Sequence, residues 1–238
     1  MKERPILFSG PMVRALLEGR KTQTRRVVKL PHSNPLGQWE PTTIGGLTGG
    51  RTKDGQTIPE QGAIWHTRTG DCLMCPYGAP GDRLWVRETF STDFRNHYPF
   101  DDVWYAADDD RRNEIEVRDG VKGIYSPEHR EHVPFRWRPS IHMPRAASRI
   151  TLEITSVRAE RLHDISEADA ANEGLHMLPA SGRYVVQKGE QYFGGADRDA
   201  RVVFADLWDR INGAGAWDVN PWVWAVTFTV IKATGEKA

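Results

Sequence analysis

Residues 19–26 read GRKTQTRR and lie between a short apolar helix pattern, residues 11–17, and the apolar pair at residues 27–28. Gly19 fits the end of that helix, and residues 24–29 have the alternation of a strand. In one extended strand, Lys21 and Thr24 would point to opposite faces, so they converge only if the chain turns between them. The preceding helix end predicts such a turn. A solvated basic loop is the alternative.

The residue types in this stretch suit proton transfer. Arg20, Arg25 and Arg26 surround Lys21 in sequence, and crowding by cations lowers a lysine's preference for the charged state. The end of a helix favours a charged lysine and acts in the opposite direction. With its pKa lowered, Lys21 can act as a base and make the Thr24 hydroxyl a nucleophile.

Few helices separate the predicted strands, which favours a mixed or antiparallel sheet over a parallel one. We therefore predict an α+β fold in one domain, residues 1–238, with the sheet curled into a small barrel and helices at its ends. The expected elements, in order, are strand 5–8, helix 11–17, strands 24–29, 83–88, 103–106 and 149–157, helices 166–173 and 199–211, and strand 222–231.

Two stretches interrupt this pattern. Residues 31–80 contain repeated Pro and Gly with little periodicity, and a hairpin around residues 57–67 is the one element expected there. Residues 91–145 carry prolines that exclude a long helix. We predict two long insertions that are largely loop.

Composition limits the possible partners. The chain has 32 Lys+Arg and 32 Asp+Glu, so a long nucleic-acid duplex is not expected as partner, although residues 1–30 are locally basic. No apolar run approaches the length of about 20 residues that a membrane span needs, and no signal-peptide pattern opens the chain. These features predict a soluble cytoplasmic protein that does not bind membranes.

Two further candidate groups stand outside residues 19–26. Glu173 ends the predicted helix 166–173, where a carboxylate is electrostatically misplaced, so it is either a surface residue or a functional one. Cys72 and Cys75 have the spacing of half a zinc site, which His66 and a further histidine would have to complete. Two free thiols are the alternative, and we predict no bound metal or cofactor.

Candidate binding residues come from two segments. Trp85 and Arg87 alternate on one strand face, where they could stack a base and hold a phosphate, although Trp85 also suits a core. Ser140 and His142 lie between Pro139 and Pro144, and Arg145 follows directly; the three either line a pocket or form a structural connection.

The motifs resemble a known family. Residues 19–26 look like the signature of the ASCH superfamily, which has a PUA-like β-barrel, and residues 81–86 and 162–175 resemble its following strand and helix. Within it, the N4-acetylcytidine amidohydrolases share the closest pattern. That resemblance implies that Lys21, Thr24 and Glu173 are the catalytic residues and that Arg26 is the arginine of the motif. The insertions 31–80 and 91–145 are absent from those small enzymes and instead resemble larger ASCH-like phage and prophage proteins labelled morphogenetic.

The resemblance implies an amidohydrolase that removes an acyl group from the exocyclic N4 of a cytidine-like nucleoside. The substrate would be a nucleoside or a base in single-stranded RNA, held by Arg26, Trp85, Arg87, Ser140, His142 and Arg145. Two alternatives remain open: a module that binds RNA or a modified base without reacting, and an ASCH-type ribonuclease.

Overall fold

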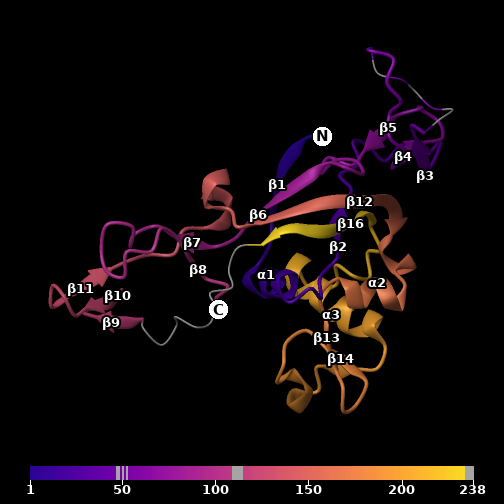
Figure 1. Ribbon diagram of the computed structural model, residues 1–238. Coiled ribbons are helices and arrows are strands. Elements are labelled where there is room, and N and C mark those ends of the chain that lie inside the picture. Colours follow the sequence, from indigo (N-terminus) through magenta and orange to yellow (C-terminus); the bar gives the residue numbers. More distant parts are fainter. Residues whose placement is uncertain (47–48, 50, 52, 109–114, 234–238) are drawn as a thin grey trace.

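A five-stranded sheet forms the centre of the molecule (Figure 1). The computed structural model describes residues 1–46, 49, 51, 53–108 and 115–233. The strands follow the order β1-β6-β12-β16-β2 across the sheet. They are β1 (Glu3–Leu7), β6 (Arg83–Arg87), β12 (Ile150–Arg161), β16 (Trp222–Ala233) and β2 (Gln23–Val27).

The sheet is mixed, as predicted, but it is not a closed barrel. Strands β1 and β6 are parallel, whereas β6, β12, β16 and β2 pair antiparallel. Within the described residues, β1 and β2 are the two edges and do not pair with each other. The α+β class is therefore confirmed, and the prediction of a closed barrel is wrong because the two edge strands do not meet.

Strand β12 explains how the sheet keeps one face apolar. Ile150, Leu152 and Ile154 alternate into the core, and a register shift then lies between Ile154 and Ser156. The extra residue of such a bulge moves the following side chains by one position, so Val157 and Ala159 also face the core.

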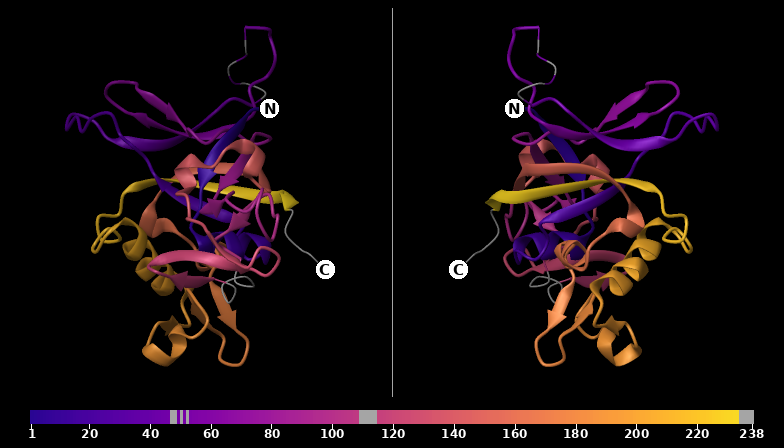
Figure 2. Two further views of the ribbon diagram at one scale, coloured as in Figure 1. Left: turned by 90° about the vertical axis from the view of Figure 1, so that its left-hand side faces the viewer. Right: turned by 90° about the vertical axis from the view of Figure 1, so that its right-hand side faces the viewer.

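Helices cover this sheet on one side (Figures 1 and 2). Helix α1 (Gly10–Leu17) buries Val13 and Leu16 in the main core. Helices α2 (Glu167–Asn172) and α3 (Ala200–Asn212) share a second core with the start of β16. The predicted helices are confirmed. The capping residues explain where α2 and α3 begin: Ser166 accepts a hydrogen bond from the Asp169 amide, and Asp199 accepts one from the Arg201 amide.

The two insertions consist largely of loop, as predicted, but they also contain small antiparallel sheets that the sequence did not indicate. The first insertion lies beyond the sheet from the helices, and the second extends as an arm (Figures 1 and 2). The first contains β3 (Trp39–Ile44), β4 (Gln61–His66) and β5 (Cys72–Met74). From the end of β6 onward the chain forms β7 (Phe90–Ser91), β8 (Trp104–Tyr105), β9 (Glu116–Arg118), β10 (Val121–Ser126) and β11 (Glu131–Pro134).

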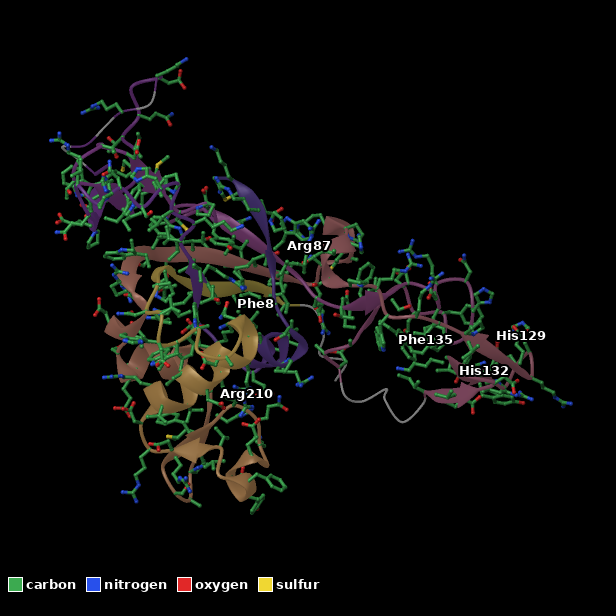
Figure 3. The ribbon with its side chains drawn as sticks, turned by 180° about the vertical axis from the view of Figure 1, so that it is seen from behind. Phe8, Arg87, His129, His132, Phe135 and Arg210 are labelled. Atoms are coloured by element: carbon green, nitrogen blue, oxygen red, sulfur yellow. The ribbon has the colours of Figure 1, made fainter. Side chains whose placement is uncertain are left out.

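Aromatic packing stabilises the arm. Phe94, Trp104 and Phe135 form a separate cluster, with ring centroids 4.3 Å apart for Phe94 and Trp104 and 5.1 Å apart for Phe94 and Phe135. Figure 3 shows Phe135 in this arm together with His129 and His132. After α2, three further short strands, β13 (His176–Leu178), β14 (Arg183–Val185) and β15 (Ala196–Asp197), form another small sheet.

Candidate functional site

Lys21 and Glu173 meet inside the protein although 152 residues separate them. Gly19, at φ 72°, ends the helical turn, and the Lys21 amide then donates to the carbonyl of Ala15. Lys21 and Glu173 form an isolated antiparallel bridge. The Lys21 Nζ donates to the Glu173 carbonyl oxygen and to its Oε2, at 2.8 Å each. Lys21 is 0% exposed and Glu173 is 4% exposed, so this is a buried ion pair.

Gly174 allows the two segments to approach this closely. Its φ is +106°, a conformation that side chains with a Cβ rarely adopt. A Cβ at this position would lie 2.9 Å from the Cβ of Ala15 and 3.2 Å from that of Lys21. The glycine after Glu173 is thus required for the packing that brings the carboxylate to the lysine.

A second cation holds the other carboxylate oxygen. The Arg25 Nη1 donates to Glu173 Oε1 at 3.1 Å, and its Nη2 pairs with Glu160 at 2.7 Å and with Asp169 at 3.2 Å. Arg158 also pairs with Asp169, at 2.8 Å. Lys21 and Arg25 offset the unfavourable place of Glu173 at the helix end and fix the direction of its carboxylate.

Burial lowers the pKa of Lys21 from its usual 10.5, and the nearby charges of Arg26 and Arg25 lower it further. Glu173 acts in the opposite direction through its charge and hydrogen bond. The pKa of Lys21 falls overall because the side chain has lost all contact with solvent, while Arg25 shares the Glu173 carboxylate that opposes this effect.

This pKa predicts how stability varies with pH. Between the lowered pKa in the folded state and 10.5 in the unfolded state, the unfolded chain binds more protons. The free energy of unfolding should therefore rise with pH in that interval, by at most about 1.4 kcal/mol per pH unit for one proton. Below the folded-state pKa, Lys21 is protonated in both states, and the free energy of unfolding stays reduced by the full cost of protonating a buried lysine.

Urea unfolding of the wild type and of Lys21→Met, from neutral pH to pH 10.5, measures this effect. We expect the difference in unfolding free energy between the two proteins to move in favour of the wild type as the pH rises. Parallel curves for the two proteins would contradict the lowered pKa.

A small pocket adjoins the ion pair. Thr24 and Arg26 of β2 line it together with Glu173, and α3 supplies the facing wall through Phe204 and Trp208. Its volume is about 50 Å³. The lining residues also include Met12, Arg25, Val27, Leu207, Ile211 and Asn212. Ile211 and Val27 are exposed, so they mark the opening.

The pocket links the predicted catalytic residues through Glu173. Thr24 and Glu173 both line it, whereas Lys21 lies deeper and touches Glu173. Phe8 packs beside this group: the Lys21 Nζ lies 5.5 Å from its ring centroid and the Arg26 Cζ lies 5.4 Å from it. Figure 3 shows Phe8 within the body of the molecule.

Two residues that line this pocket each carry a buried donor without a hydrogen-bond partner among the described residues. The donors are the Nε of Arg26 and the Nε1 of Trp208. An unpaired buried donor typically costs about 1–3 kcal/mol, so two of them on residues that line one pocket need an explanation.

The other predicted binding residues lie elsewhere. Trp85 and Arg87 share a face, as predicted, and the Arg87 Cζ lies 4.7 Å from the Trp85 ring centroid. The Arg145 Cζ lies 5.9 Å from the same ring, and Arg145 forms two hydrogen bonds of 2.9 Å with Glu3. Trp85 is 8% exposed beneath these guanidinium groups, which favours its interpretation as a core residue rather than as a stacking platform.

Ser140 and His142 belong to a short 3-10 helix. His142 lines a different pocket with Phe90 and Arg138, and none of that pocket's lining residues is shared with the pocket at Thr24. Of the six predicted binding residues, only Arg26 therefore lies with the predicted catalytic set.

The two cysteines do not form a metal centre in the described part of the chain. Cys72 is exposed and Cys75 is buried, and burial raises the pKa of the Cys75 thiol to about 11. The His66 ring packs against His32 and Trp39, with centroids 4.7 and 5.1 Å away. No cluster of three or more His, Cys, Asp or Glu side chains suited to a metal ion occurs among the described residues.

Two residues of the site escaped the sequence analysis in their present roles. Trp208 fits the apolar spacing of a core helix, and only the N–H group of its indole hints at a polar role. Arg25 contributes a cation to residues 19–26, but nothing in the sequence indicates that it holds Glu173.

The chain matches no protein-family model, no curated protein and no solved structure. The resemblance to ASCH proteins thus remains a prediction carried by residues 19–26, 81–86 and 162–175. In the part of the chain that the structure describes, no helix combines the length and hydropathy needed to cross a bilayer.

Proposed function

We propose that the protein is an amidohydrolase of the ASCH type, with a PUA-like arrangement of its sheet, that removes an acyl group from the N4 of a cytidine-like nucleoside. One observation carries the proposal: a fully buried lysine is paired with a carboxylate that lines the same pocket as a threonine. A lysine amine with a lowered pKa, a hydroxyl and a carboxylate are the groups that acyl transfer through a covalent intermediate requires.

In the first half-reaction, the neutral amine of Lys21 takes the proton of the Thr24 hydroxyl. The hydroxyl oxygen attacks the amide carbon, and the carbonyl electron pair moves onto its oxygen. As that pair returns, the bond from carbon to N4 breaks. The proton passes from Lys21 to Glu173 along the 2.8 Å hydrogen bond between Lys21 Nζ and Glu173 Oε2, and from Glu173 to the leaving N4. Cytidine leaves, and the acyl group remains on Thr24.

In the second half-reaction, water attacks the acyl ester and gives a proton to Glu173. The ester bond breaks and Thr24 recovers its proton, so the net products are cytidine and a carboxylic acid. Arg25 keeps the Glu173 carboxylate oriented throughout and acts as a positioning residue.

A direct assay tests the proposal. Purified protein incubated with N4-acetylcytidine should release cytidine and acetate in equal amounts, measured by chromatography. A parallel incubation with labelled single-stranded RNA separates the alternatives that the sequence left open. Retention of intact RNA without acetate release would indicate a binding module, and RNA fragments would indicate a ribonuclease.

A further inference from the structure

The two unpartnered donors come from opposite walls of one pocket. Arg26 belongs to β2 and Trp208 to α3, and both line the cavity at Thr24. The Arg26 guanidinium is held in place because its Nη2 donates to the Leu7 carbonyl at 2.6 Å and its Cζ lies over Phe8. The Trp208 side chain is 4% exposed and packs against Phe204, with ring centroids 6.0 Å apart. Both donors are thus fixed in position before a ligand arrives.

The remainder of the wall is apolar and the space is small. Phe204, Leu207 and Ile211 line it from α3. A volume of about 50 Å³ holds only a few water-sized groups, since one such group occupies about 10–15 Å³ on this measure. An acetyl group, with its carbonyl oxygen and methyl group, suits this space, whereas a pyrimidine ring must remain at the opening.

We propose that this pocket is the acyl subsite of the enzyme and that it selects a short acyl group. The Nε–H of Arg26 and the Nε1–H of Trp208 donate to the acyl carbonyl oxygen, and the α3 side chains surround the methyl group. This inference rests on the proposed function. The carbonyl oxygen gains negative charge when the Thr24 oxygen attacks, so donors that are already in place stabilise that charge as well as the bound substrate.

The test compares two ligands that differ in the carbonyl oxygen. N4-acetylcytidine carries it, and N4-ethylcytidine has a methylene group instead. Dissociation constants are measured by calorimetry in a Thr24→Val background, where turnover cannot remove the ligand. Trp208→Phe, which keeps an aromatic ring but lacks the N–H, should weaken binding of N4-acetylcytidine about 10-fold and leave that of N4-ethylcytidine unchanged.

Stability supplies an independent readout. The Trp208 Nε1 has no partner in the described part of the chain, so Trp208→Phe loses buried ring surface but no hydrogen bond, and it should lower the melting temperature less than the loss of a tryptophan whose N–H is paired. Trp104→Phe is the matched control, because the Trp104 Nε1 donates to Asp101 at 2.9 Å in the arm. That variant should lose stability and bind both ligands as before.

Each outcome decides the matter. If Trp208→Phe weakens the binding of both ligands equally, or of neither, the acyl subsite is overturned. Hydrolysis by the wild type is unaffected by that result. If the wild type binds N4-acetylcytidine with the expected dependence on Trp208 but releases no acetate, the subsite stands and the proposed hydrolysis is wrong. Failure of the Thr24→Val chain to bind either ligand would overturn the subsite.

Discussion

Replacing Lys21 with methionine should lower kcat for N4-acetylcytidine about 10²–10⁴-fold and change KM much less, because the lysine acts on a proton in the transition state. Lys21 does not line the pocket in the described structure, so its loss removes no direct contact with bound substrate. Steady-state kinetics on the purified variant measure both constants.

Lys21→Arg separates base catalysis from a purely electrostatic role. Arginine retains the positive charge toward Glu173 but does not lose its proton in proteins, so it cannot take one from Thr24. We expect Lys21→Arg to be as impaired as Lys21→Met. Substantial activity in the arginine variant would mean that Lys21 supplies charge rather than a base.

The control for this series is Lys29→Met, an exposed lysine in the same basic region. It should leave kcat and KM unchanged. Lys21→Met also removes one partner of a buried ion pair, which typically costs about 3–5 kcal/mol of stability. Arg25 still pairs with Glu173 in this variant, so we expect a loss near the lower end. Circular dichroism at the assay temperature confirms that the compared proteins are folded.

Local patterns predicted the elements around the site but not their contacts. The apolar spacing before Gly19 and the alternation after residue 23 identify α1 and β2, because each pattern depends on neighbours in sequence. The contact of Lys21 with Glu173 joins segments 152 residues apart, and no local signal specifies it. A resemblance between motifs was therefore needed to place the two residues together.

The errors have physical reasons of their own. Strands such as β7 and β5 span two or three residues, too few for alternation to be recognised, and Pro41 and Pro134 lie within β3 and β11. The predicted barrel failed because the number of strands does not determine whether the edges meet. Trp208 has the same apolar spacing whether its N–H faces a packed core or a pocket, so its orientation required the structure.

Thr24→Val should have the largest effect on turnover, a loss of about 10³-fold or more, because it removes the attacking atom. Valine is also β-branched and suits the strand, so the fold and the pocket shape should persist. Thr22→Val, two residues earlier, is the matched control and should retain full activity. Thr24→Ser retains a hydroxyl and should restore most of the turnover.

A covalent intermediate provides the sharper test of the same role. If the Thr24 oxygen attacks the substrate, rapid quenching during turnover should leave one acetyl group on the peptide that contains Thr24, detectable by mass spectrometry. The acetyl group should be absent from Thr24→Val. Glu173→Gln should slow its removal, because the carboxylate that lines the pocket would no longer accept a proton from water. Turnover without any acetylated peptide, combined with an active Thr24→Val, would show that water attacks the amide directly and that Thr24 only shapes the pocket.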